Sequence, residues 1–162
     1  MACVDDFHNF ADYAELDLVE IGEAGQLGKG VFAKEDIPKY QLLGEYLGEL
    51  VPADWYVDAT DSYIFTIEGE FVITAKDYGN WTRFVNHHCD PNVSAAVGMY
   101  GHRRSVIFRA NRDIAAGEQL CIHYGENYFS NLGINCSCDA NAAPHQPVGN
   151  GDPFPWPPPT WY

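Results

Sequence analysis

Basic residues, cysteines and long apolar runs are all scarce in this sequence of 162 residues. Only 9 Lys and Arg stand against 23 Asp and Glu, for a net charge of −14, which disfavours direct nucleic-acid binding and favours basic partners. The alternative is that the acidic residues only form a solvated surface. No apolar run reaches the roughly 18 residues of a membrane-spanning helix, so no membrane association is expected. The first residues also lack the basic and apolar regions of a signal peptide, so an intracellular protein is expected.

Cysteine is limited to five residues. The odd count and the missing export signal argue against a disulfide framework. Two of the five, Cys136 and Cys138, form a C-x-C pair. Such a pair suits a thiolate metal site when further ligands come from elsewhere in the chain.

Short β-branched and aromatic runs, separated by Gly, Pro, Asn and Asp, recur from about Val19 onward. This pattern predicts one mostly-β domain rather than alternating βαβ units. A helical turn or insertion is expected at Trp55–Asp61. Residues 139–162 hold seven of the ten prolines and are expected to form either a linker or a flap over a groove. The expected strands are Gly30–Ala33, Gln41–Val51, Tyr63–Ile67, Phe71–Thr74, Val93–Val97, Ser105–Ala110 and Gln119–Tyr124.

The stretch RFVNHHCDPN at 83–92 gathers two histidines, a cysteine and two asparagines. Neighbouring residues of a strand point to opposite faces, so His87 and His88 are poorly placed to bind one metal ion together. Asn86 and His87 suit recognition of a small polar ligand better, and Pro91-Asn92 fits a turn that ends the segment. Gly28-Lys29-Gly30 offers a backbone that a ligand can approach closely.

Five motifs in order resemble the SET-domain lysine methyltransferases: G-x-G, E-Y-x-G-E, R-F-x-N-H-x-C-x-P-N, G-E-x-L-x-x-x-Y-G and C-x-C. They lie at 28–30, 45–49, 83–92, 117–125 and 136–138. The resemblance implies a SET-domain fold with several small β-sheets, a knot-like C-terminal crossing, short helices and a Pro-rich tail. The expected divisions are a lead-in at 1–18, the SET domain at 19–130, a post-SET-like segment at 131–145 and a Pro/aromatic-rich tail at 146–162.

The resemblance implies protein-lysine N-methylation with S-adenosylmethionine as the methyl donor. Tyr124 would be the catalytic tyrosine. The substrate channel would contain Tyr63, Phe65, Ile122 and Tyr124. The cofactor would be held by Leu27, Gly28, Lys29, Gly30, Tyr63, Arg83, Asn86 and His87.

These residue types suit methyl transfer to an amine. A free lysine has a pKa of about 10.4, so only about one in a thousand is neutral near pH 7. An apolar, aromatic channel and a nearby sulfonium both favour the neutral amine. The Tyr124 hydroxyl would orient that amine, and most of the rate enhancement would come from alignment.

The sequence departs from the family pattern in the post-SET segment. The family's C-x-C-x4-C has Ala143 at its last position, which leaves Cys89, Cys136 and Cys138 as thiolates. His145 would complete a Cys3His zinc set, and the alternative is a vestigial site with free thiols. Two positions before Tyr124, where related enzymes often carry Phe or Tyr, stands Ile122, which predicts di- or trimethylation.

The expected partner is a basic, lysine-containing protein tail, with a histone favoured, and the expected location is the nucleus or alternatively the cytoplasm. Three other interpretations stay open. They are a silent SET module that binds a basic peptide, a methyltransferase for a non-histone protein, and a β-rich zinc-binding scaffold. The sequence does not specify which lysine of which protein is methylated.

Overall fold

The computed structural model describes residues 18–55, 61–67, 71–100, 103–125, 128–129, 136 and 138. The chain divides into two compact units, residues 1–124 and 125–162. The predicted Pro-rich tail, His145 and all of the lead-in except Leu18 lie outside the described residues.

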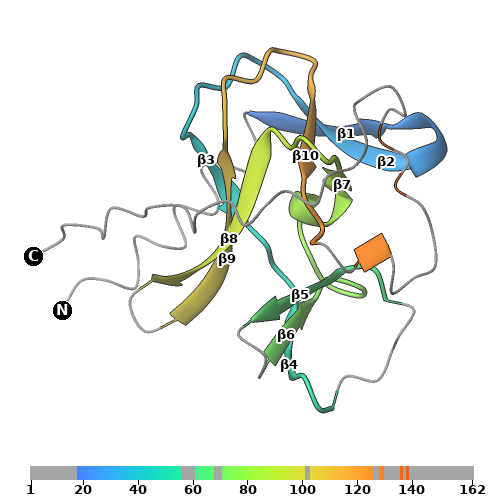
Figure 1. Cartoon of the computed structure of the whole chain (residues 1–162), viewed down its shortest axis with the longest axis vertical. Helices are drawn as coiled ribbons and strands as arrows, with labels where there is room; N and C mark the ends of the chain where they lie inside the picture. Colours follow the sequence, from blue (N-terminus) through green and yellow to red (C-terminus); the bar gives the residue numbers. More distant parts are fainter. Residues whose placement is uncertain are drawn as a thin grey trace, which may run out of the picture. The chain divides into compact units, whose positions relative to one another are not determined.

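Ten strands and two short 3-10 helices form the described part of the first unit (Figure 1). The strands make three small sheets, in the orders β1-β2-β10-β7, β3-β9-β8 and β4-β6-β5. The predicted mostly-β fold with several small sheets is therefore confirmed. The strands are β1 (Val19–Glu23), β2 (Lys29–Ala33), β3 (Leu42–Glu45), β4 (Glu49–Pro52), β5 (Ile64–Ile67), β6 (Phe71–Thr74), β7 (Asn86–His87), β8 (Val93–Tyr100), β9 (Arg103–Ala110) and β10 (Gln119–Ile122).

The single strand expected at Gln41–Val51 is wrong, because the structure has two strands there. β3 pairs with β9, whereas β4 pairs with β6 in a different sheet. Between them, Tyr46 is buried and its N–H donates to the Val106 carbonyl at 2.8 Å. The chain thus anchors one residue in the core and then changes sheets, which a run of apolar residues does not reveal.

The two helices are η1 (Gly25–Leu27) and η2 (Trp81–Phe84). Asn80 caps η2, since its side-chain oxygen accepts from the Thr82 N–H at 3.3 Å. The same amide group donates to the Glu45 carbonyl at 2.9 Å, which attaches the cap to the end of β3. The sequence predicts a helical turn or insertion at Trp55–Asp61. Trp55 ends a turn that covers residues 53–55, and residues 56–60 lie outside the described part.

An aromatic cluster forms the centre of the core. Phe108 of β9 is completely buried, and three rings surround it at centroid distances of 6.1, 6.1 and 6.3 Å: Tyr46, Phe65 and Trp81. Aromatic rings bury large apolar areas and add edge-to-face attraction at such distances. Phe65 carries the cluster into the small β4-β6-β5 sheet, so these aromatic rings join two of the three sheets.

Strand β10 determines where the motifs meet. It pairs antiparallel with β2 and parallel with β7, so it lies between the G-x-G strand and the Asn86-His87 strand (Figure 1). Three motifs that are far apart in the sequence therefore become neighbours in one sheet.

Within the described residues, no helix has the length and apolar character needed to cross a membrane.

Candidate functional site

The turn between β1 and β2 brings the predicted cofactor-binding backbone into a tight loop. The Ala24 N–H donates to the Gly28 carbonyl at 2.7 Å, and the Gly28 N–H donates to the Gly25 carbonyl at 3.1 Å. Gly28 has φ 77° and ψ −113°, a conformation that only glycine adopts readily. A Cβ at Gly28 would have nothing within 4 Å, so open space borders its backbone. Leu27 is 48% exposed beside it.

Asn86 of β7 connects the two predicted cofactor-binding segments. Its side-chain amide donates to the Lys29 carbonyl at 2.9 Å. The close approach of the Asn86 side chain to β2 requires a glycine at position 30. A Cβ at Gly30 would lie 2.6 Å from Gln119 Nε2 and 3.2 Å from Asn86 Nδ2. The side chain of Lys29 forms an exposed ion pair with Glu23, so only its backbone takes part in this arrangement.

Tyr63 and Arg83 lie against each other. The Arg83 guanidinium is 4.6 Å from the centre of the Tyr63 ring, and it also donates to the Lys76 carbonyl at 2.9 Å. A guanidinium at this distance is attracted to the ring face. The structure thus brings together two more of the predicted residues, which are 20 positions apart in the sequence.

Two residues that sequence reasoning missed hold Tyr63 in place. The buried carboxylate of Asp61 accepts from the Tyr63 N–H at 2.7 Å and from the Thr74 hydroxyl at 2.6 Å. The hydroxyl of Tyr46 donates to the Tyr63 carbonyl at 2.7 Å. The Asp-x-Tyr spacing was the available signal for the first contact, because Asp side chains often accept from the N–H two residues later.

Tyr124 is held at both ends by the segment that contains Asn86. Its hydroxyl donates to the Val85 carbonyl at 2.8 Å, and its backbone N–H donates to His87 Nδ1 at 3.0 Å. Its ring is partly buried and lies 5.4 Å from the His87 ring. The predicted catalytic tyrosine and the predicted cofactor-binding pair therefore share one short stretch of chain.

The other two predicted channel residues belong to the core. Ile122 of β10 is 2% exposed and faces His87 in the strand register. Phe65 is half-buried, and its ring centre lies 4.7 Å from that of Tyr46.

Asn92 is a structural link rather than only a turn residue. Its buried side-chain amide donates to Glu118 Oε1 at 2.9 Å and to the Gln119 carbonyl at 2.8 Å, and its Oδ1 accepts from the Cys121 N–H at 2.8 Å. Arg112 also pairs with Glu118, at 2.6 Å. The hydrogen bond from Arg112, helped by that from Asn92, lowers the pKa of the Glu118 carboxyl from 4.5 to about 2.

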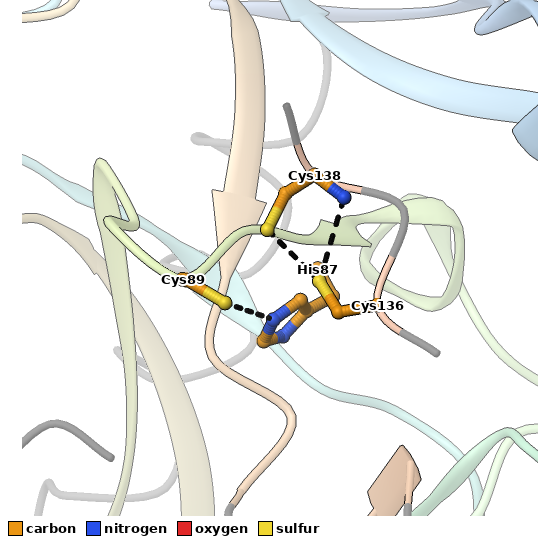
Figure 2. Close-up of side chains that lie close together, drawn as sticks. All are labelled: His87, Cys89, Cys136 and Cys138. Atoms are coloured by element: carbon orange, nitrogen blue, oxygen red, sulfur yellow. Dashed lines mark hydrogen bonds between the residues drawn. The ribbon is translucent and has the colours of Figure 1, made fainter. Parts of the chain in front are cut away.

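Three of the predicted metal ligands are described: Cys89 in the first unit, and Cys136 and Cys138 in the second. In the first unit, Cys89 Sγ lies 3.4 Å from His87 Nε2. In the second, the sulfurs of Cys136 and Cys138 lie 2.8 Å apart (Figure 2). In the described part of the chain, one group of side chains could hold a metal ion: His87, Cys89, Cys136 and Cys138. No disulfide is present among the described cysteines.

In the described part of the chain, β10 is the last strand, and it lies between the strand of the glycine turn and the Asn-His strand. Residues 28–125 match the SET domain family, which is more than half of the chain. This chain therefore belongs to the SET domain family.

Curated relatives share this region. The chain is 35% identical over 130 residues to the histone-lysine N-methyltransferase EHMT1 of Mus musculus, covering 74% of this chain and 10% of that protein. It is 39% identical over 120 residues to the histone-lysine N-methyltransferase EZH2 of Chaetomium thermophilum, covering 65% and 8%. It is 38% identical over 104 residues to the H3 lysine-4 specific histone-lysine N-methyltransferase of Schizosaccharomyces pombe, covering 59% and 11%. The chain thus spans about a tenth of the length of these relatives.

Proposed function

We propose that this chain is an S-adenosylmethionine-dependent protein-lysine N-methyltransferase that acts on a histone tail. The observation that carries the proposal is the double attachment of Tyr124 to Val85 and His87. Between those two residues lies Asn86, whose amide is bonded to the Gly28–Gly30 turn. The tyrosine expected to orient the amine and the turn expected to hold the methyl donor are thus positioned by three consecutive residues.

The chain's residues fit S-adenosylmethionine, which supplies an electrophilic methyl group on a sulfonium when bound. The open space beside Gly28 leaves room for a ligand against the backbone. The residues that would hold it are Leu27, Gly28, Lys29, Gly30, Tyr63, Arg83, Asn86 and His87. The first four would act mainly through backbone groups, since the Lys29 side chain is engaged with Glu23.

The side chains of the channel would prepare the lysine for attack. Tyr63 and Phe65 are partly buried aromatic residues, and desolvation beside them would favour the neutral amine. The Tyr124 hydroxyl donates a hydrogen bond to the Val85 carbonyl, so the lone pairs of its oxygen stay available to accept from an amine N–H. This arrangement supports an orienting role for Tyr124 rather than a role as a strong base.

The charge supports a basic protein substrate, because 23 acidic residues against 9 basic ones attract Lys- and Arg-rich segments. The names of the relatives, all histone-lysine N-methyltransferases, favour a histone tail and hence the nucleus. A silent SET module is the second candidate, because the C-x-C pair lacks the next cysteine of the family pattern.

We further propose that zinc binds Cys89, Cys136, Cys138 and His145. The thiols of Cys136 and Cys138 converge on each other, and three thiolates with one imidazole form an ordinary zinc set. His87 is less suited as the fourth ligand. Its Nδ1 already accepts from Tyr124, so its neutral ring carries a proton on Nε2, the nitrogen that faces Cys89. Nε2 of that tautomer has no lone pair for a metal.

Methyl transfer from labelled S-adenosylmethionine to intact core histones tests the proposed function. The variant Tyr124→Phe removes the hydroxyl, and Tyr78→Phe, at a 72% exposed tyrosine, is the matched control. Label on one histone with the wild type and Tyr78→Phe but not with Tyr124→Phe is the expected result. Cofactor binding measured by calorimetry without transfer to any histone would instead favour the silent module or a non-histone substrate.

A further inference from the structure

The imidazole of His87 has a specific neighbour at each of its two nitrogens. On one side, Nδ1 accepts the backbone N–H of Tyr124 at 3.0 Å. On the other, Nε2 lies 3.4 Å from the sulfur of Cys89. Figure 2 marks this contact with a dashed line. The ring therefore lies between the proposed catalytic tyrosine and the sulfur of Cys89.

The first contact determines the tautomer. A backbone N–H is always a donor, so Nδ1 must offer a lone pair, and the proton of the neutral ring must be on Nε2. That Nε2–H then points at Cys89, whose sulfur accepts it.

We infer that His87 is a positioning residue that holds Tyr124 through Nδ1 and is itself oriented by Cys89 through Nε2. This inference rests on the proposed function and adds to it. The motif's histidine would contribute its ring to the placement of Tyr124 and not only its backbone to the cofactor.

The location of the contact supports a positioning role. The parallel pairing of β7 and β10 includes Cys121 with Asn86 and Ile122 with His87, and the His88 N–H donates to the Ile122 carbonyl. Tyr124 comes two residues beyond the last paired residue. Its backbone is thus fixed by the His87 ring at the place where the strand ladder ends.

The ring of His87 also packs against a second histidine. His123 lies 5.0 Å away, centre to centre, in an edge-to-face arrangement with an interplanar angle of 64°. Together with the two contacts at the nitrogens, this packing limits rotation of the imidazole about its Cβ–Cγ bond. The Tyr124 backbone therefore depends on a ring with little freedom to turn.

Two substitutions separate the two nitrogens. In His87→Asn, the amide oxygen takes the place of Nδ1 and can still accept from Tyr124, but nothing reaches Cys89. In His87→Gln, the longer amide takes the place of Nε2 and reaches the sulfur, but the acceptor for Tyr124 is lost. His88→Asn is the control, because the half-buried ring of His88 bonds to the backbone of Asp90 rather than to Tyr124 or Cys89.

We expect kcat to depend on whether residue 87 offers an acceptor for the Tyr124 backbone N–H. We expect kcat of His87→Gln to fall about tenfold or more, since a small misplacement of a reacting group can cost as much as about 10²-fold. We expect His87→Asn to lose less of its kcat than His87→Gln, with cofactor affinity similar in both variants. Equal kcat in the two variants would overturn the inference, and thermal unfolding of each variant separates this effect from loss of fold.

A measurement without substrate decides the inference even if no histone is methylated. Nitrogen NMR of labelled wild type should show His87 with its proton on Nε2. Hydrogen exchange at the Tyr124 amide should be slow in the wild type and His87→Asn and faster in His87→Gln. A proton on Nδ1, or fast Tyr124 exchange in the wild type, would refute the inference whatever the activity.

Discussion

The side-chain amide of Asn92 and the carboxylate of Glu118 lie 2.9 Å apart, although 26 positions separate them in the sequence. Through this bond and the two backbone bonds of Asn92 to β10, the motif at 83–92 is attached to the strand that leads to Tyr124. The link is buried at Asn92, so its hydrogen bonds are shielded from water. Two predictions follow from it.

The first concerns acidity. The pKa of Glu118 is lowered in the folded chain, from 4.5 to about 2, so this carboxylate stabilises the fold above pH 4.5. Between these values the unfolded chain binds more protons, and the stabilisation is lost as the pH falls from about 4.5 toward 2. Urea unfolding as a function of pH should show this loss in the wild type and a flatter profile in Glu118→Gln. The exposed Glu35→Gln is the control, and an unchanged slope in Glu118→Gln would contradict the prediction.

The second concerns Asn92 itself. Asn92→Ala leaves the Cys121 N–H and the Gln119 carbonyl without their side-chain partner and should lower the free energy of unfolding by about 2–4 kcal/mol. Asn92→Asp should be worse at pH 7, because its carboxylate would face the Glu118 carboxylate and a carbonyl oxygen. Denaturant unfolding measures both. Asn92→Asp more stable than Asn92→Ala at pH 7 would show that this assignment of the bonds is wrong.

A third prediction tests the link between the glycine turn and Asn86. Gly30→Ala would place a Cβ 3.2 Å from Asn86 Nδ2 and 2.6 Å from Gln119 Nε2, so one of these side chains must move. We expect affinity for S-adenosylmethionine, measured by calorimetry, to fall about tenfold, which corresponds to the loss of about one hydrogen bond. Gly25→Ala, where a Cβ meets nothing within 4 Å, is the control for a backbone effect alone. Equal losses in the two variants would remove the role given to Gly30.

A fourth prediction concerns metal. Purified protein should contain about one zinc per chain, and His145→Ala should lower its zinc affinity by weakening a four-ligand set. His87→Asn should retain zinc, because in the wild type the His87 ring is engaged with Tyr124 and is not expected to be a zinc ligand. Elemental analysis of the three proteins decides between the ligand sets. Zinc-free wild type as isolated would indicate a vestigial site.

A fifth prediction concerns the product. Ile122 has no ring hydroxyl that could hold a water against the amine, so we expect di- or trimethyllysine at completion. Ile122→Phe should shift the product toward monomethyllysine, at a cost of about 1–3 kcal/mol in stability because Ile122 is 2% exposed. Mass spectrometry of the product measures the distribution. Monomethyl product alone from the wild type would contradict the prediction.

The sequence was sufficient for the fold class, for most of the strands and for the family. Short β-rich runs revealed the strands, and five ordered motifs revealed the SET domain, whose family match covers residues 28–125. The assigned roles of Tyr124, Asn86 and the zinc ligands stay predictions.

What the sequence did not reveal depends on contacts between distant residues. The separation of β3 from β4 requires knowledge of which sheet each one joins, and apolar periodicity carries no such information. Asn92 fitted a turn by its local context, whereas its side chain in fact bonds to β10. The His87 ring was not assigned to Tyr124 because their contact spans 37 positions.

Val85, Asn86 and His87 bond respectively to the Tyr124 hydroxyl, to the Lys29 carbonyl and to the Tyr124 N–H. The proposed cofactor-binding turn and Tyr124, which is proposed to orient the amine, are therefore both positioned by the same three residues. When thermal motion displaces this tripeptide, both groups move by the same vector. The distance between the reacting atoms is a difference of two positions, so a shared displacement cancels out of it. A chain whose described strands form three small sheets can in this way keep the two groups aligned without being rigid as a whole.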